Sequence, residues 1–124
     1  MNKNMNGHLL LHAQDAVIQT FDWGELHWFA NSQIGNSQTM TVGQCILKSG
    51  RENPRHFHPN CEEILRVVQG RIQHSIADAF VEMGPGDTIS IPADVVHNAL
   101  NIGTEDAIMM IVFSSAARQT EGEF

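Results

Sequence analysis

Glycine and proline interrupt this chain so often that few of the intervals between them are long enough for a helix. The intervals are short runs rich in β-branched and apolar residues, a pattern typical of the strands of a β-sandwich or β-barrel. The clearest runs are Thr39–Lys48, Glu63–Gln69, Arg71–Ile76, Thr88–Ile91 and Ala107–Phe113. The chain is therefore predicted to be all-β. Its 124 residues, without a repeat or a shift in composition, predict a single domain over residues 1–124.

The two ends of the chain are less clearly patterned. Phe21–Asn31 contains both tryptophans and is expected to be another strand, packed over the core or against a partner subunit. Residues 8–20 have weak helical periodicity, but strand or irregular structure is the preferred prediction. The polar residues 114–124 are expected to form a tail that is loose at its end.

Charge argues against two classes of partner. Fourteen acidic side chains against seven basic ones give a formal net charge of −7, which repels phosphate backbones and anionic lipid. Nucleic acid and membrane surfaces are therefore not expected partners. Most basic residues gather in one part of the chain, where a solvated edge is expected more than a rim for an anionic ligand. They are Lys48, Arg51, Arg55, Arg66 and Arg71.

Cysteine content and hydropathy predict a cytoplasmic protein. There are two cysteines, Cys45 and Cys61, whereas a secreted domain of this size more often carries a denser disulfide framework. The N-terminus has an apolar run of only three leucines, Leu9–Leu11, and lacks the apolar centre of a signal peptide. No stretch approaches the roughly 18 to 20 apolar residues that a membrane-spanning helix needs.

Candidate metal ligands begin with a histidine pair. Side chains two apart on a strand share a face, so His56 and His58 point the same way and Phe57 points the other way. Pro59 and Asn60 then indicate a turn, because proline cannot continue a central strand. The chain can reverse there and bring a residue of the next strand back beside the two imidazoles.

Two adjacent glutamates follow this turn, and strand alternation separates them. Glu63 shares its face with Leu65 and Val67, an apolar set suited to a barrel interior. Glu62 falls on the other face, with Arg66. A carboxylate that points into an apolar interior is costly without a partner, and a divalent cation removes that cost. Two imidazoles and a carboxylate suit zinc, iron, manganese or nickel.

A third imidazole is available downstream. After a Gly-Pro-Gly turn, a short strand and a proline break, His97, Ala99 and Asn101 are expected to share one face. A strand that lies across a barrel at this point would place His97 opposite the pair of His56 and His58.

The two histidine segments resemble the two motifs of the cupin superfamily. The first motif is Gly, five residues, His-x-His, three or four residues, Glu, six residues and Gly. It is matched by Gly50, His56, His58, Glu63 and Gly70. The second is Gly, five residues, Pro-x-Gly, two residues, His, three residues and Asn. It is matched by Gly86, Pro92, His97 and Asn101, with Asp94 at the internal glycine. Because aspartate tolerates left-handed backbone geometry, this turn is expected to survive.

The resemblance implies a small antiparallel β-barrel of the jelly-roll type with one divalent metal ion inside. The implied ligands are His56, His58, Glu63 and His97, with open coordination positions for water or substrate. The resemblance also implies a homodimer, in which N-terminal strands from residues 1–37 pack across subunits. The motifs themselves cover about residues 50–101.

Two further residues are candidates for the pocket. His74 alternates with two isoleucines and is expected to face inward, as a hydrogen-bonded core histidine, as a donor to the metal ligands or as a pocket base. Gln44 and Cys45 lie on opposite faces of one strand, and Gln44 contacts a ligand only if its own face lines the barrel. Cys61 is expected to be a turn cysteine without a role.

These features predict a metal-dependent enzyme that acts on a small polar or anionic molecule. The resemblance leaves dioxygenase, isomerase and decarboxylase reactions open, because cupins perform all three with this ligand set. The absence of tyrosine excludes the thiol-dioxygenase branch, which uses a Cys–Tyr crosslink. The alternative is a non-catalytic barrel that binds a small molecule or a metal as a sensor or storage protein.

Overall fold

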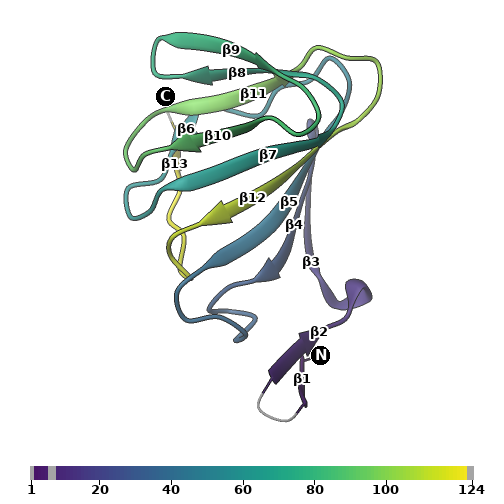
Figure 1. Cartoon of the computed structure of the whole chain (residues 1–124), viewed down its shortest axis with the longest axis vertical. Helices are drawn as coiled ribbons and strands as arrows, with labels where there is room; N and C mark the ends of the chain where they lie inside the picture. Colours follow the sequence, from purple (N-terminus) through teal and green to yellow (C-terminus); the bar gives the residue numbers. More distant parts are fainter. Residues whose placement is uncertain (1, 6–7, 123–124) are drawn as a thin grey trace.

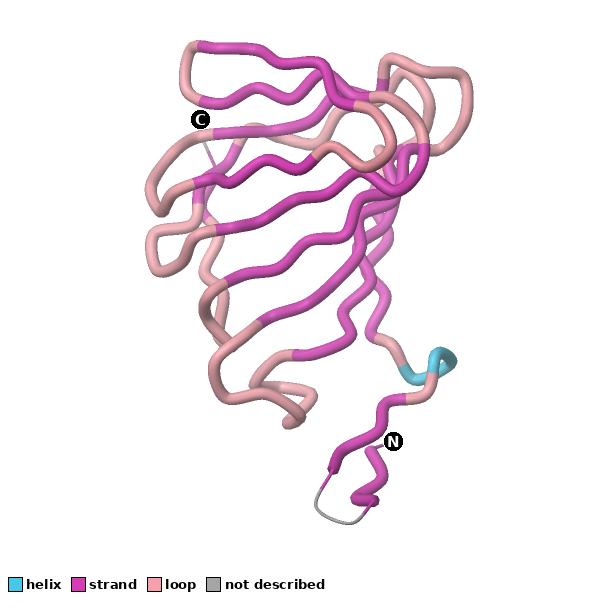
Figure 2. The backbone as a smooth tube through the Cα atoms, viewed as in Figure 1, coloured by secondary structure: helices cyan, strands magenta, loops and turns pink. Residues whose placement is uncertain are grey.

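The computed structural model of the chain describes residues 2–5 and 8–122. Strands and loops make up nearly all of them, with one short 3-10 helix, η1, at Ala13–Asp15 (Figure 2). The prediction of an all-β fold is therefore confirmed. Among the described residues, no helix has the length and apolar character needed to cross a membrane.

The strands are short and follow one another along the whole described chain. They are β1 (Asn2–Met5), β2 (His8–Leu11), β3 (Val17–Phe21), β4 (Gly24–Ala30), β5 (Thr41–Leu47), β6 (His56–Phe57), β7 (Glu63–Gln69), β8 (Ile72–Ile76), β9 (Ala79–Met83), β10 (Thr88–Ile91), β11 (His97–Asn101), β12 (Ala107–Phe113) and β13 (Glu121–Gly122).

The strands form two sheets around a common interior, together with a separate hairpin (Figure 1). One sheet has the order β10-β7-β12-β5-β4-β3 and the other the order β13-β6-β11-β8-β9. Every pairing between described strands is antiparallel. Sheet neighbours come from distant parts of the chain, as in a jelly roll. Among the described strands, β1 and β2 pair only with each other, and they project from the barrel beyond β3 (Figure 1).

Alternation along the six-stranded sheet builds the interior. In β5, β7 and β12 every second side chain is buried, and those between are half-buried or exposed. The buried set joins residues of the facing sheet, such as Ile72 and Ala99, in one apolar core. Side chains of the site described below arise from the same inner faces.

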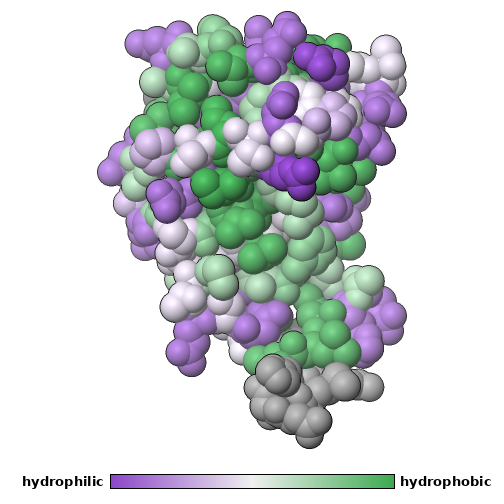
Figure 3. Space-filling view, viewed as in Figure 1, coloured by the Kyte–Doolittle hydropathy of each residue, from purple (hydrophilic) through white to green (hydrophobic). Residues whose placement is uncertain are grey.

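Part of the outer face of the six-stranded sheet, on β7 and β12, is also apolar. Ile64 and Val68 of β7 are 38% and 51% exposed, and Met110 and Val112 of the neighbouring β12 are half-buried. Figure 3 shows apolar residues, in green, gathered over the middle of the molecule in the view of Figure 1. An apolar surface of this kind is typical of a contact with another protein surface.

The secondary structure predicted for residues 8–31 agrees with the structure. Residues 8–20 contain β2, η1 and β3, so strand or irregular structure is correct there. The strand expected at Phe21–Asn31 is β4, which begins after a two-residue turn. Residues 1, 6 and 7 of the expected N-terminal packing segment lie outside the described residues.

The C-terminal segment is bound to the barrel up to residue 122, and the prediction of a loose end falls on residues 123–124. Residues 114–122, here called the C-terminal strap, are tied to the barrel along their length. The N–H of Ser114 donates to the carbonyl of Glu62, and the carbonyl of Ala116 accepts from the N–H of Ser32. β13 then pairs with β6. These contacts were missed because their partners lie far away in the sequence, and residues 123–124 lie outside the described residues.

Candidate metal centre

His56 and His58 enter the interior from the five-stranded sheet. β6 is only two residues long, and it pairs with β11 on one side and with β13 on the other. His56 is half-buried, and His58, directly after the strand, is 3% exposed. The two ring centroids are 5.0 Å apart, so both imidazoles point to the same side.

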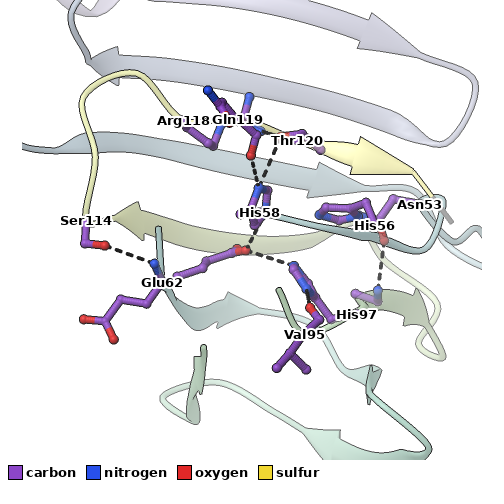
Figure 4. Close-up of polar contacts among 12 residues, drawn as sticks. Asn53, His56, His58, Glu62, Val95, His97, Ser114, Arg118, Gln119 and Thr120 are labelled. Carbon is purple, nitrogen blue, oxygen red and sulfur yellow. Dashed lines mark hydrogen bonds and ion pairs between the residues drawn. The ribbon is translucent and has the colours of Figure 1, made fainter. Parts of the chain in front are cut away.

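Of the two glutamates, it is Glu63 that meets these imidazoles. Glu63 begins β7, is 4% exposed and shares its buried face with Leu65. Its Oε1 lies 3.2 Å from Nε2 of His58. Glu62 is exposed, and its carboxylate points away from His58 and His97 (Figure 4). The alternation argument therefore separates the two glutamates correctly.

His97 begins β11 and completes the group. It lies opposite His56 in the strand register, with the ring centroids 4.3 Å apart. Its Nε2 is 3.0 Å from Oε1 of Glu63. One ligand atom from each of His56, His58, Glu63 and His97 lies within 4.8 Å of the others. The turn before β11 survives as expected, because Asp94 adopts a φ of 69° in the left-handed region.

Each imidazole of the group is fixed through its Nδ1 by a backbone carbonyl. The acceptors are the carbonyls of Pro54 for His56 at 2.8 Å, Gln119 for His58 at 2.9 Å and Val95 for His97 at 2.9 Å. Figure 4 shows two of these bonds, those of His58 and His97. A carbonyl can only accept, so it assigns the proton to Nδ1 and leaves the Nε2 lone pair facing the interior.

The Nε2 atoms that lie around Glu63 therefore carry no proton in this tautomer. Nε2 of His97 and Oε1 of Glu63 are both acceptors in this tautomer, and Nε2 of His58 is buried without a hydrogen-bond partner. Acceptors collected in this way repel one another unless a cation lies among them. Three neutral imidazoles and a carboxylate are a donor set for a divalent transition metal, so the residues fit the ion that the sequence predicts.

The environment favours the protonation states that metal binding needs. Burial, followed by the neighbouring His97, lowers the pKa of His56 to about 4. Burial opposes the ionisation of Glu63, but His58 and His97 outweigh burial when their Nε2 atoms carry a proton and donate to the carboxylate, and they lower its pKa to about 2. At neutral pH, His56 is therefore a neutral imidazole and Glu63 a carboxylate.

The four residues line a cavity of about 350 Å³ inside the barrel. The rest of its wall is largely apolar and includes Phe21, Trp23, Leu26, Trp28, Met109 and Ile111. Trp28 has room beside β5 because Gly43 has no Cβ, which would lie 2.5 Å from the indole ring. A cavity of this size accommodates a small organic molecule.

Of the two predicted pocket residues, His74 lines this cavity and Gln44 does not. His74 is 1% exposed, its ring lies 5.8 Å from that of His97, and its Nδ1 has no hydrogen-bond partner. Burial, followed by His97, lowers the pKa of His74 to about 4, so its imidazole is neutral. Gln44 lies on the outer face of β5, because alternation gives the interior to Cys45.

The cysteines and the basic cluster contribute little to the cavity. Both thiols are unpaired; burial raises the pKa of Cys45 to about 12 and also raises that of Cys61, so neither is a nucleophile at neutral pH. Of the basic residues between Lys48 and Arg71, only Arg55 lines the cavity, and its Nη1 donates to Oγ of Ser75 at 2.9 Å.

The C-terminal strap supplies site residues that sequence reasoning missed. Arg118 and Thr120 line the cavity, and the carbonyl of Gln119 fixes His58. No local pattern marks these residues, because the partner of Gln119 lies 61 positions earlier in the chain.

Comparison with known proteins places the chain among barrels of this architecture. The family model described as Cupin domain matches residues 43–113, more than half of the chain. Germin-like protein 3-8 of Oryza sativa subsp. japonica is 29% identical over 85 residues, which cover 64% of this chain and 38% of the relative. Polyketide synthase CurC of Streptomyces cyaneus is 30% identical over 76 residues, which cover 61% of this chain and 49% of the relative. The chain thus spans less than half the length of these two curated relatives.

Solved structures share the fold. Oxalate decarboxylase of Lactobacillus farciminis, in a formate complex, has a TM-score of 0.82 and 25% identity, covering 90% of this chain and 34% of that chain. Oxalate decarboxylase of Bacillus subtilis, which has Mn(II) centres, has a TM-score of 0.77 over 85% of this chain and 29% of that chain. With 18% identity, the second comparison shows the fold alone.

Proposed function

Because the chain belongs to the Cupin domain family, we propose that it is a metal-dependent enzyme acting on a small organic anion. One divalent ion is held by His56, His58, Glu63 and His97. The observation that carries this proposal is the convergence of three fixed imidazoles on one buried carboxylate, with the ligand atoms within 4.8 Å of one another.

The metal ion, when bound, supplies a Lewis acid that polarises a carboxylate or carbonyl group of the substrate. The chain's own residues orient and isolate that substrate. The apolar wall excludes water, which strengthens electrostatic interactions inside the cavity. His74, neutral and with an unpaired buried Nδ1, is the residue beside the centre that is placed to accept a proton.

Among the three reaction types open from the sequence, decarboxylation of an organic acid has the most support. The formate complex of oxalate decarboxylase is similar over 90% of this chain. Manganese is the first metal to test, because oxalate decarboxylase of Bacillus subtilis has Mn(II) centres. Iron, zinc and nickel suit the same donors.

Elemental analysis tests the metal centre. Wild type, His97→Ala and His27→Ala are reconstituted separately with manganese, iron, zinc and nickel. His27 is the matched control, because its Nε2 contacts Glu25 on the outer face of β4. We expect one ion per chain in wild type and in His27→Ala, and loss of the ion in His97→Ala. A wild type that retains none of the four metals would refute the proposal.

Turnover separates an enzyme from a binding protein. Carbon dioxide release and oxygen uptake are measured with a panel of keto acids, dicarboxylates and aromatic acids. Metal-dependent turnover that disappears in His97→Ala supports an enzyme. Saturable binding without turnover would favour the alternative of a non-catalytic sensor or storage barrel.

The proposal includes a setting for this activity. The protein acts as a homodimer in the cytoplasm, with a small-molecule ligand and without nucleic-acid or membrane partners. The two unpaired thiols support a reducing compartment.

A further inference from the structure

Arg118 lies in the same cavity as the metal centre but is not part of it. Its guanidinium carbon is 4.4 Å from the ring centroid of Trp28 and 5.2 Å from that of Phe113. The Phe113 ring lies in turn 4.9 Å from the ring of His58. A single aromatic side chain therefore contacts both this cation and one of the proposed metal ligands.

The chain holds Arg118 in place from both sides. Nδ2 of Asn60 donates to the carbonyl of Ala117 at 2.9 Å, and Oδ1 of Asn60 accepts from the N–H of Gln119 at 2.9 Å. The two residues that flank Arg118 are thus fixed to the turn that follows His58. A guanidinium positioned in advance loses less conformational entropy when it binds a ligand.

The guanidinium has no carboxylate partner in the described part of the chain. Its Nη1 donates to Oγ1 of Thr120, and none of the ion pairs among the described residues includes Arg118. A guanidinium carries several N–H donors, so one hydroxyl leaves most of its capacity unused. A half-buried cation beside an apolar wall is stabilised by an anion that enters the cavity.

The wall beyond Arg118 is apolar and partly aromatic. The rings of Phe21 and Trp23 stack with centroids 4.7 Å apart and planes 5° apart. Leu26 and Met109 line the same cavity. Surfaces of this kind favour a flat apolar body, which stacks on the rings without losing hydrogen bonds to water.

The charges that line the cavity favour an anion. Glu63 is the only carboxylate among the described lining residues, and the three imidazoles surround it. A bound divalent ion more than offsets this single negative charge. The cavity is then positive inside a protein whose net charge is −7.

We propose that Arg118 determines specificity in this cavity by anchoring the anionic group of an organic acid with an aromatic or similarly flat apolar body. The part of this inference in which the acid faces the metal rests on the proposed function, whereas the part in which the acid contacts Arg118 does not. A cavity of about 350 Å³ with these walls is larger and more apolar than oxalate requires. The substrate class that we propose therefore differs from oxalate, which is named for the similar structures.

Tryptophan fluorescence provides the test, because both tryptophans of the chain line the cavity. Benzoate, benzamide and acetate are titrated into metal-free and zinc-loaded wild type, Arg118→Gln, Arg118→Lys and the exposed control Arg51→Gln. We expect wild type to bind benzoate more tightly than benzamide, which lacks the charge, and than acetate, which lacks the ring. Arg118→Gln is expected to weaken benzoate binding by about tenfold or more and benzamide binding by less than about twofold. Arg118→Lys keeps part of the affinity, and Arg51→Gln keeps all of it.

Two results would overturn the inference: equal benzoate affinity in Arg118→Gln and wild type, or equal affinity of wild type for benzoate and benzamide. If circular dichroism shows that Arg118→Gln is unfolded, Arg118→Lys and the wild-type comparison decide the matter. Metal content keeps the two proposals distinguishable. A wild type that binds no metal but binds benzoate through Arg118 refutes the proposed function and supports this inference. A wild type that binds a full complement of metal, but in which substitution of Arg118 does not change benzoate affinity, supports the metal centre of the proposed function and refutes this inference.

Discussion

The backbone carbonyl of Gln119 accepts a hydrogen bond from Nδ1 of His58 at 2.9 Å. The two residues are 61 positions apart, yet this bond decides which nitrogen of His58 faces Glu63. The C-terminal strap is thus part of the candidate metal centre, although it supplies none of the four ligand atoms.

Weakening the strap is expected to weaken metal binding. Asn60→Ala removes the side chain that accepts from the N–H of Gln119, so His58 loses a fixed carbonyl partner. We expect metal affinity to fall by about tenfold, as measured by competition with a chelator. Gln69→Ala is the control, because its Nε2 also donates to a backbone carbonyl, that of Asp106, at 3.0 Å. Unchanged affinity in Asn60→Ala would show that the strap does not orient the ligand.

The two adjacent glutamates are expected to behave differently on substitution. Glu63→Gln removes the buried charge among the imidazoles and should cost on the order of 3 kcal/mol of metal-binding free energy, whereas Glu62→Gln should cost almost nothing. The metal-free Glu63→Gln protein should keep its fold, because an amide N–H can donate to Nε2 of His97 where a carboxylate cannot. Isothermal titration with zinc measures the affinities, and equal losses in the two variants would contradict the assignment.

The stability of the metal-free protein is expected to fall in mildly acidic solution. Burial lowers the pKa of His56 and of His74 from 6.5 to about 4. As the pH falls from about 6.5 to about 4, the unfolded chain takes up protons on these residues before the folded protein does, so the free energy of unfolding decreases. The contribution of these two histidines to the free energy of unfolding is fully present above about pH 6.5 and is lost below about pH 4.

Urea denaturation of the metal-free protein at several pH values measures this effect. His74→Gln removes one of the two titrating groups, so its free energy of unfolding should depend less steeply on pH than that of wild type. The comparison between the two proteins cancels the contributions of other ionisable groups. Identical pH dependence would mean that His74 titrates normally in the folded state.

The N-terminal hairpin is expected to stabilise a dimer. Within the described part of the chain, β1 and β2 pair only with each other, and a lone two-stranded hairpin is marginally stable in water. Leu9 and Leu10 are 47% and 39% exposed, so a second copy of the chain can cover them. We expect the double variant Leu9→Lys, Leu10→Lys to shift the protein toward monomer in light scattering after size-exclusion chromatography. Phe80→Lys changes an exposed apolar residue of β9, a strand at the opposite end of the molecule from β1 and β2 (Figure 1), and should leave the mass unchanged.

The sequence predicts the elements whose determinants are local. Runs of β-branched residues mark β5, β7, β8, β10 and β12, and alternation along β7 is enough to choose Glu63 over Glu62. β6 was expected from the spacing of His56 and His58, but β13 was not predicted, because it is two residues long and exists through pairing with a distant strand. The role of Arg118 could not be predicted for the same reason, because its contacts with Trp28 and Phe113 depend on how the strap crosses the barrel.

Asp94 shows what the second histidine motif requires at its internal glycine. Its φ of 69° lies in the left-handed region, and the turn still delivers His97 to the group. The motif at this position is therefore a constraint on a torsion angle, and glycine is only the most common way of meeting it. A genome search that accepts aspartate or asparagine here will recover barrels that a search by residue identity rejects.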